Sequence, residues 1–408
     1  MLIRSVGDMA VGRADPNKAL NELRKHVSAG QAGLAWDMAL LRERGKSKFG
    51  AGAAGMLFTK DGLEMASGSG PALYHARRLK ELGIYHVIDL CSGIGGDALA
   101  FAAAGMNVTM VDLDPLHLQF ATANAKALGL SSLVNTAVGD ASSPSFISDL
   151  ALAYPGAALW FDPARRTGGK RTVQPEAYAP PLSMLNVFAL HDFPIVGVKL
   201  APSIDHSLSL EYGASLEFLS HNGECKEGLL WISKTVSAKA PIRAVLLKGD
   251  NVLVLEGISD TQGGARESRS PLVQTQSNKY LFEPDPAVIR AHLVQRLAVD
   301  LQASSIDPQI AYLVGDTPAQ SPFAQCYPVI EKFSYSRRTL QEVVTRNNVG
   351  HLIVKKRGVP VEPEEIISQL KLKGETEKIA VITREGSSRV GFLCEKPLVM
   401  DGIGADSE

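Results

Sequence analysis

The sequence predicts an α/β fold with a mostly parallel sheet, a helical region before it and a small α+β domain after it. Between residues 85 and 200, short β-rich runs alternate with helical runs, as in HVIDL (86–90) followed by GDALAFAAAG (96–105). This order is typical of parallel strands joined by crossover helices. Before residue 80, apolar residues recur at three- and four-residue spacing, and from about residue 283 helix-like and strand-like runs are mixed.

We therefore expect an N-terminal helical region (1–80), a sheet domain (81–260) and a C-terminal α+β domain (280–400). Short runs at 215–257, joined by polar turns, predict the antiparallel end of the sheet plus an extra hairpin. DPAVIRAHLVQRLAVDL (285–301) predicts one amphipathic helix. The polar, Gly/Ser-rich stretch TQGGARESRSP (261–271) is the predicted linker.

Composition limits the class of protein. The 408 residues carry a net charge of −1, so any nucleic-acid surface must be local rather than global. The four cysteines are far apart in sequence, which predicts neither a disulfide scaffold nor a zinc site, and no metal is expected. The start lacks the apolar core of a signal peptide, and no apolar run is long enough to span a membrane. A cytoplasmic protein is the expectation.

Two predicted strand ends carry the first chemical signals. Asp89-Leu-Cys91-Ser-Gly93-Ile-Gly95-Gly96-Asp97 follows one strand and opens a helix, and its glycines allow a tight turn close to a ligand. Asp112 ends the next strand, 23 residues after Asp89, where a carboxylate can bind both hydroxyls of a ribose. Asp114 and Pro115 instead predict a helix N-cap and first turn.

The third and fourth strand ends add further acids. Gly139-Asp140-Ala141 follows the third strand, where a carboxylate or an amide can contact an adenine ring, although a simple turn also fits. Asp162-Pro163 follows the fourth strand, where the carboxylate could orient or deprotonate a nucleophile. The next residues, PARRTGGKR (163–171), hold four basic residues, and Arg165 and Arg166 are candidates for phosphate contacts unless the loop is merely solvated.

These four motifs, in this order, resemble the series of class I S-adenosylmethionine-dependent methyltransferases. The match covers about residues 85–200 and implies a Rossmann-like sheet with S-adenosylmethionine as cofactor. More narrowly, DLCSGIGGDALAFAAAGMNVTMVDLDP (89–115) resembles trimethylguanosine synthase and its bacterial relatives. GHLIVKKRGVP (350–360) and LKLKGETEKIAVITR (370–384) resemble the THUMP-like domain that follows the methyltransferase domain in those bacterial proteins.

The resemblance implies residue roles. The candidate cofactor contacts are Asp89, Cys91, Gly93, Gly95, Asp112, Asp140 and Ala141. Asp162 and Pro163 occupy the catalytic position of the [D/N/S]PP[Y/F/W] motif of base N-methyltransferases. The sequence departs there, because DPAR lacks the second proline and the aromatic residue that stacks on the accepting base. The accepting atom is therefore left open, and Trp160 is expected in the core.

THUMP domains belong to RNA-modifying enzymes, so RNA is the expected partner. Residues 331–378 hold ten Lys/Arg against seven Asp/Glu. The candidate phosphate-contacting patch comprises Lys355, Lys356 and Arg357, together with Lys371 and Lys373. A solvated strand edge protected by charge is the alternative. Lys199, Asp205 and His206 follow the fifth strand without a settled role.

Two other functions stay open. Gly93-x-Gly95-x-x-Ala98 also fits a loose dinucleotide fingerprint, so a NAD-dependent oxidoreductase is one alternative, although no hydride-transfer constellation accompanies it. The other is a non-catalytic RNA-binding protein that keeps the fold, for which the departure at DPAR leaves room. The sequence favours a methyltransferase acting on a base in RNA.

Overall fold

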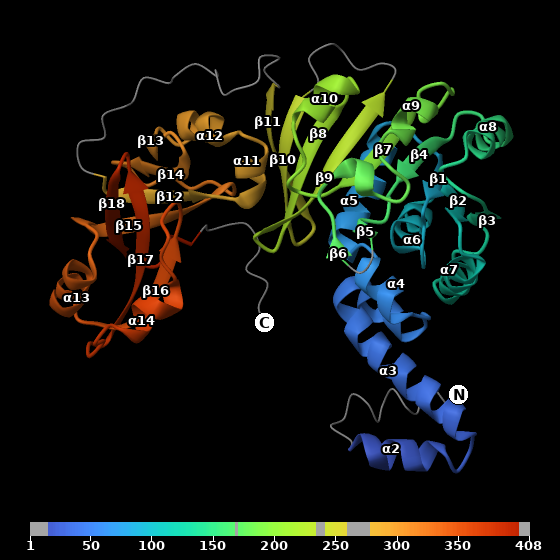
Figure 1. The fold of residues 1–408 in the computed structure, drawn as a ribbon, viewed down its shortest axis with the longest axis horizontal. Coiled ribbons are helices and arrows are strands. Elements are labelled where there is room, and N and C mark those ends of the chain that lie inside the picture. Colours follow the sequence, from blue (N-terminus) through green and yellow to red (C-terminus); the bar gives the residue numbers. More distant parts are fainter. Residues whose placement is uncertain (1–14, 168–169, 234–240, 259–277, 400–408) are drawn as a thin grey trace. The chain divides into compact units, whose positions relative to one another are not determined.

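A computed structural model describes residues 15–167, 170–233, 241–258 and 278–399 (Figure 1). The chain forms two compact units, and each is described by itself. The first comprises Met1–Ser215 and Gly228–Ala238, and the second comprises Leu216–Glu227 and Lys239–Glu408. The predicted linker at 261–271 lies outside the described residues. No helix in the described part of the chain is long and apolar enough to cross a membrane.

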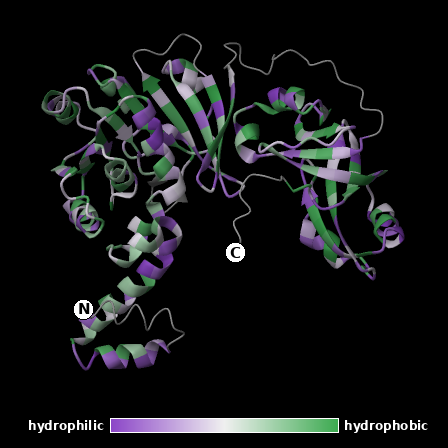
Figure 2. Ribbon diagram, turned by 180° about the vertical axis from the view of Figure 1, so that it is seen from behind, coloured by the Kyte–Doolittle hydropathy of each residue, from purple (hydrophilic) through white to green (hydrophobic). Residues whose placement is uncertain are grey.

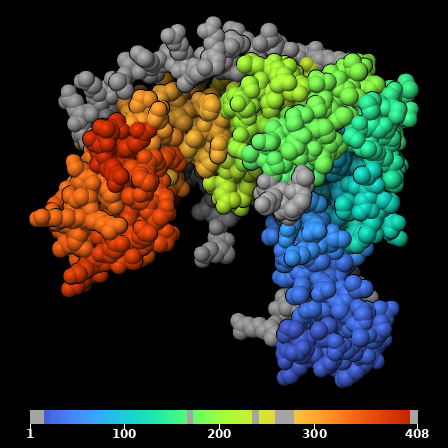
Figure 3. All heavy atoms as spheres, in the orientation of Figure 1, coloured from blue at the N-terminus to red at the C-terminus, as the bar shows by residue number. Residues whose placement is uncertain are grey.

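The first unit begins with helices, as the periodicity predicts. They are α2 (Pro16–Leu23), α3 (Ala29–Phe49), a 3-10 helix (Gly50–Ala54), α4 (Lys60–Met65) and α5 (Ser69–Glu81). Ser28 starts α3 through a capping box, in which its side chain and that of Gln31 bond each other's backbone N–H. Trp36 of α3 packs with Leu23 of α2 in a small separate core, which lies in the dark blue lobe of Figure 3.

A mostly parallel sheet follows. Its elements are β1 (His86–Leu90), α6 (Gly96–Ala103), β2 (Asn107–Asp112), α7 (Pro115–Ala127), β3 (Val134–Val138), α8 (Pro144–Ala153), β4 (Ala158–Phe161), α9 (Met184–Phe188), β7 (Ile195–Leu200) and α10 (Ser207–Glu211). Strands β7, β4, β1, β2 and β3 pair in this order, all parallel. The predicted alternation is confirmed. Strands β1, β4 and β7 are almost wholly buried, which explains their continuous apolar runs (green in Figure 2).

The predicted antiparallel end and hairpin are present as well. Strand β9 (Glu224–Ser233) pairs antiparallel with β7 through Gly228–Ser233. In the second unit, β10 (Pro241–Lys248) and β11 (Asn251–Ile258) form the hairpin. Strand β8 (Ser215–His221), however, runs parallel to β10, which the short turns did not predict.

The C-terminal part of the second unit is an α+β domain, as predicted. Its seven strands pair in the order β13-β14-β12-β15-β18-β17-β16. They are β12 (Tyr280–Pro284), β13 (Ser304–Asp307), β14 (Ile310–Gly315), β15 (Ala324–Ser334), β16 (Val349–Lys356), β17 (Thr376–Glu385) and β18 (Ser388–Cys394). The helices α13 (Arg337–Arg346) and α14 (Pro363–Ser368) pack with β16 and contribute to one apolar core.

One predicted helix is wrong in length. The stretch 285–301 forms two short helices, α11 (Pro286–Arg290) and α12 (Val294–Asp300), rather than one. His292 between them has a φ of 57°, in the left-handed region that ends a right-handed helix. No proline or glycine marks this break in the sequence.

Candidate functional site

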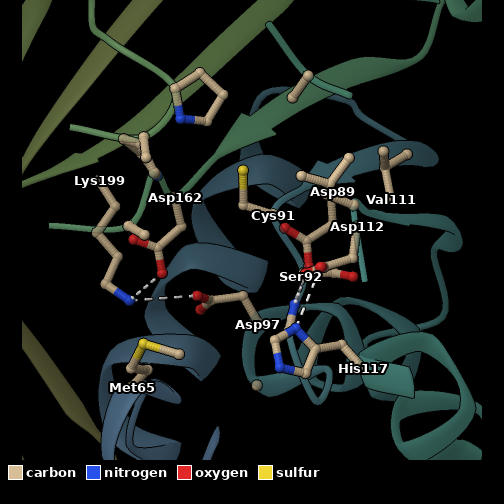
Figure 4. A pocket seen from close by; sticks show the side chains of 18 of the residues that line it. Met65, Asp89, Cys91, Ser92, Asp97, Val111, Asp112, His117, Asp162 and Lys199 are labelled. Carbon is tan, nitrogen blue, oxygen red and sulfur yellow. Dashed lines mark hydrogen bonds and ion pairs between the residues drawn. The ribbon is translucent and has the colours of Figure 1, made fainter. Parts of the chain in front are cut away.

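A cavity of about 570 Å³ lies where β1, β2, β3, β4 and β7 of the first unit end (Figure 4). Ligands in open α/β sheets bind at this edge, and the volume is in the range of small-molecule sites. The lining includes every predicted cofactor residue except Gly95, together with Asp162, Pro163 and Arg165. It also includes Gly62 and Glu64–Ser67, which come from α4 and the segment after it.

The loop after β1 is shaped by left-handed residues. Gly93 has a φ of 55° and Gly95 of 92°, which confirms the tight turn that the glycines predict. Cys91 also has a positive φ, 65°, and this strain was not predicted for a side chain with a Cβ. Burial raises the pKa of the Cys91 thiol far above its usual value, and four nearby carboxyl groups raise it further, so the thiol stays protonated.

Asp112 organises this loop. Its Oδ2 accepts a hydrogen bond from the Gly93 N–H at 2.8 Å, and its Oδ1 accepts one from the Asp114 N–H at 2.9 Å. His117 Nδ1 lies 3.2 Å from the same Oδ1. Asp114 caps α7 by accepting from the Leu116 N–H at 2.8 Å, as predicted. Asp112 thus lines the cavity while tying the first two strand ends together.

Two more predicted acids line the cavity in contrasting surroundings. Asp140 is exposed, and its Oδ1 accepts hydrogen bonds from the Ser142 side chain at 2.6 Å and from the Ser142 N–H at 2.8 Å, which lower its pKa. This is the simple turn that the sequence left as an alternative, and Ala141 beside it is buried. Asp89 is 2 % exposed, and burial raises its pKa well above the usual value.

Asp162 belongs to a buried charge network that the sequence did not predict. Lys199 Nζ donates to Asp162 Oδ2 at 2.7 Å and to Ser67 Oγ at 2.7 Å. Ser67 Oγ in turn donates to Asp97 Oδ2 at 2.6 Å, and His75 Nδ1 lies 2.8 Å from Asp97 Oδ1. Burial raises the pKa of Asp162, with Lys199 opposing it. Burial also acts to raise the pKa of Asp97, but Lys199 and His75 lower it below its usual range.

Around this network, the neighbouring predictions have mixed outcomes. Trp160 is fully buried and stacks on His75, with ring centroids 4.5 Å apart, so its expected place in the core is confirmed. Asp205 and His206 are not among the described residues that line the cavity. Asp205 instead accepts a hydrogen bond from the Ser207 N–H at 2.8 Å, at the start of α10.

The segment after Asp162 folds back over the site. Ala164 and Ala179 exchange backbone hydrogen bonds of 2.9 and 3.0 Å, which brings Tyr178 and Ala179–Pro181 to the cavity wall. Tyr178 is therefore an aromatic ring near the position where DPAR lacks one, although only 3 % of the residue is exposed. Arg166 starts the short strand β5 (Arg166–Thr167), which pairs with β6 (Lys170–Arg171). Residues 168–169 lie outside the described residues.

The predicted basic patch of the C-terminal domain is largely neutralised. Lys355 pairs with Glu283 and lies over the Tyr327 ring, and Lys356 pairs with Glu362 at 2.6 Å. Arg357 stacks on Tyr312 at 4.7 Å and lies 4.0 Å from Glu283. The sequence shows these three positive charges but not their partners. Their role in contacting phosphate stays a prediction, and their contacts within the domain favour a structural role.

This arrangement leads to a stability prediction. We expect Glu283→Gln to lower the free energy of unfolding by roughly 1–3 kcal/mol, because it weakens the half-buried pair with Lys355 and the hydrogen bond from Tyr327. Urea denaturation followed by circular dichroism would measure it. The matched control is Glu342→Gln, which breaks an exposed pair with Arg338 and should cost about 0.5 kcal/mol or less. Equal effects of the two changes would contradict a structural role for Glu283.

Two protein families match parts of this chain. Residues 84–172 match the family described as RNA cap guanine-N2 methyltransferase, and residues 324–396 match the family described as THUMP domain-like. A Mycobacterium tuberculosis protein described as an uncharacterized S-adenosylmethionine-dependent methyltransferase, found in strains CDC 1551 and H37Rv, is 29% identical over 362 residues. The match covers 87% of this chain and 93% of that protein.

A solved structure shares the fold along nearly the whole chain. The crystal structure of a Porphyromonas gingivalis W83 protein assigned to the methyltransferases superposes with a TM-score of 0.76 at 20% identity, covering 97% of both chains. The α/β fold with a THUMP-like C-terminal domain is thereby confirmed. The alternative of a NAD-dependent oxidoreductase finds no support among these relatives.

Proposed function

Since the chain is an S-adenosylmethionine-dependent methyltransferase that ends in a THUMP-like domain, we propose that it methylates a base in RNA. The observation that carries the proposal is the carboxylate of Asp162 in the cavity wall, held by Lys199 at the end of β4. The matches to an RNA methyltransferase family and a THUMP-like family support RNA as the acceptor. The non-catalytic alternative predicts no role for this carboxylate.

The cavity suits the cofactor. The Ser92 Oγ is buried in the cavity wall, and no partner for it is found in the described part of the chain, so it is available to a ligand. Asp112 would bind the ribose hydroxyls, and Asp140 or the Ala141 N–H would bind the adenine. Asp89, Cys91 and the loop through Gly93 would surround the rest of the cofactor. Gly95 would shape the turn of that loop. When bound, the cofactor supplies an electrophilic methyl group on a sulfonium.

Asp162 would act on the accepting base. Its Oδ2 is taken by Lys199, while Oδ1 receives no hydrogen bond from the described residues. Oδ1 would accept a hydrogen bond from an N–H of the base and thereby orient the nitrogen. As the new N–C bond forms and the S–C bond breaks, that nitrogen must lose a proton, which Asp162 can receive. Pro163 lines the cavity beside it and is the one proline of the motif that the DPAR sequence keeps.

Arg165 and Arg166 would hold the RNA backbone near the site. Arg165 lines the cavity next to Asp162, and Arg166 follows it. Changing both to alanine should weaken RNA binding. The slope of log K against log salt concentration should become shallower by about 0.7 for each lost contact to a phosphate of single-stranded RNA. Affinities measured at several salt concentrations would show this. An unaltered slope would remove the loop from the RNA site.

A second RNA-contacting surface is expected around α13. Among the described residues, four exposed basic side chains near it have no acidic partner, and these are Arg337, Lys371, Lys373 and Arg389. The Tyr335 N–H donates to the Arg389 carbonyl at 2.9 Å, and Gln341 of α13 bonds the backbone of Lys371 at 2.8 and 3.2 Å. These contacts bring positive charge that no described acidic residue balances close to α13. Such a surface is suited to binding phosphates.

Neutralising this α13 surface should weaken RNA binding without changing cofactor binding. For Arg337→Ala with Lys371→Ala, we expect the salt slope to fall by about 1.4, from two lost phosphate contacts. The matched control is Arg296→Ala with Lys396→Ala, which removes two ion-paired cations of the same domain. Equal losses of affinity in both variants would assign the effect to net charge rather than to this surface.

The decisive test of the function compares modified nucleosides in RNA from a deletion strain and from the parent by mass spectrometry. A methylated nucleoside should disappear on deletion and return with the intact gene, but not with an Asp162→Ala gene. If every methylated nucleoside persists in the deletion strain, the RNA-base proposal is rejected. If the Asp162→Ala gene restores the nucleoside, the role of Asp162 is rejected.

A further inference from the structure

We propose that Lys199 is a positioning residue for methyl transfer, which holds one oxygen of Asp162 so that the other faces the accepting base. The inference rests on the proposed function, because it assigns Lys199 a task at the acceptor site. Neither the motif series nor the resemblance gives this lysine a role.

Lys199 is fixed at both ends. Its backbone lies in β7, with Val198 paired to Phe161 of β4 and Lys199 itself paired to Leu229 of β9. The side chain is 6% exposed, and Nζ donates at 2.7 Å both to Ser67 Oγ and to Asp162 Oδ2. Figure 4 shows the contact with Asp162. A lysine held in this way cannot swing between rotamers without breaking two buried hydrogen bonds.

The two acids near Lys199 have different tasks. Asp97 has a 5% exposed side chain, and both of its oxygens are engaged, Oδ2 by Ser67 and Oδ1 by His75. It lies 3.7 Å from Nζ and serves as a buried counter-ion. Asp162 has a 23% exposed side chain, and only its Oδ2 is engaged by the described residues. Lys199 therefore selects which oxygen of Asp162 is left for a ligand.

The charge of Lys199 also acts on the protonation of Asp162, because it opposes the rise in pKa that burial causes. The charged groups that face this carboxyl are Lys199 from β7, Asp97 from α6, Arg165 from the following loop and Asp89 from β1. Burial and the neighbouring acids favour the neutral carboxyl, whereas Lys199 and Arg165 favour the carboxylate. A protonated Asp162 would donate a hydrogen bond rather than accept one, and it could not take a proton from the base.

A purely structural explanation is less satisfactory. Removing an ammonium group from water costs several kcal/mol, and apolar replacements of buried ion pairs are often as stable or more stable. The network nevertheless gathers Ser67, Asp97 and Lys199 from three separate parts of the chain at the cavity wall. It does so beside DPAR, the point where the familiar motif has lost its second proline and its aromatic ring.

The test measures the pKa of Asp162 by NMR in the full-length protein, in which aspartate is labelled with ¹³C at Cγ. The resonance that is absent from Asp162→Asn is assigned to Asp162. Removing an adjacent opposite charge should raise the pKa of Asp162 by about 1–3 units in Lys199→Met. Lys199→Arg should keep it near the wild-type value. Lys126→Met, which changes an exposed lysine of α7, is the matched control and should leave it unchanged. Should Lys199→Met fail to fold, Lys199→Gln serves, since it retains polarity and loses the charge.

Methyl transfer gives the second readout. With S-adenosylmethionine carrying a tritiated methyl group and RNA from a deletion strain, Lys199→Met should lower kcat while the KM for S-adenosylmethionine stays within about twofold. The acidic limb of its pH–rate profile should move to higher pH. Lys199→Arg should restore most of the rate. If Asp162 has the same pKa in the wild type and in Lys199→Met, the inference is overturned. If the wild type methylates no RNA, the proposed function fails, while the titration still decides whether Lys199 controls Asp162.

Discussion

Asp162→Ala is expected to lower the rate of methyl transfer by about 10²- to 10⁴-fold, the range typical of a lost acid–base group. The reason is that Asp162 lines the cavity at the end of β4, with a side chain that is 23% exposed. The affinity for S-adenosylmethionine should change little, because the predicted cofactor contacts come from β1, β2 and β3. Single-turnover transfer to RNA and calorimetric titration with S-adenosylmethionine would separate the two effects.

The control for this variant must allow for the loss of the ion pair between Asp162 and Lys199. Asp162→Asn keeps an oxygen for Lys199 and should fold as the wild type does. Asp149→Ala removes an exposed aspartate of α8, with no expected effect on transfer. Full activity of a folded Asp162→Ala protein would contradict the catalytic role. A parallel loss of cofactor affinity would instead place Asp162 in the cofactor site.

Asp112→Ala is expected to weaken S-adenosylmethionine binding by about 100-fold or more. A charged acceptor contributes roughly 1.5–3 kcal/mol for each hydrogen bond, and a ribose offers two hydroxyls. Asp112 also accepts hydrogen bonds from the Gly93 and Asp114 N–H groups, so the loop after β1 would lose its anchor as well. Calorimetry with S-adenosylmethionine and with its demethylated product would measure the loss.

Adenosine as a competing ligand would locate the effect of Asp112. If ribose recognition is the cause, Asp112→Ala should lose affinity for adenosine and for S-adenosylmethionine by similar factors. Thermal unfolding of the ligand-free variant would show whether the protein remains folded. Unchanged affinity in a folded Asp112→Ala protein would refute the ribose assignment.

The sequence predicted those parts of the site that depend on local order. Each acid stands just after a strand, and parallel strands bring their carboxyl ends to one edge, so Asp89, Asp112 and Asp162 line one cavity. The buried network could not be predicted in this way, because Ser67 and Lys199 are 132 residues apart in sequence. Their contact depends on how α4 and α5 pack against the sheet, which periodicity does not specify.

In the fold, too, features set by local sequence order were predicted and features set by other contacts were not. Alternating runs identified the parallel sheet, because crossover connections are local in sequence. The break at His292 was missed because neither proline nor glycine marks it, and only its left-handed backbone ends α11. Likewise, the charges of Lys355, Lys356 and Arg357 are visible in the sequence, but the partner of Lys355 lies 72 residues away in β12.

The contribution of Glu64–Ser67 to the cavity limits how this enzyme could be divided or recombined. A gene fragment that begins at the first strand would encode all four strand-end acids, yet it would lack Ser67, and Lys199 would lose its hydrogen bond to the Ser67 hydroxyl. The backbone N–H of Ser67 also approaches Gly96 so closely that a Cβ there would lie 3.0 Å from it. Transplanting the sheet domain onto another C-terminal domain would therefore require the preceding helices to be included as well.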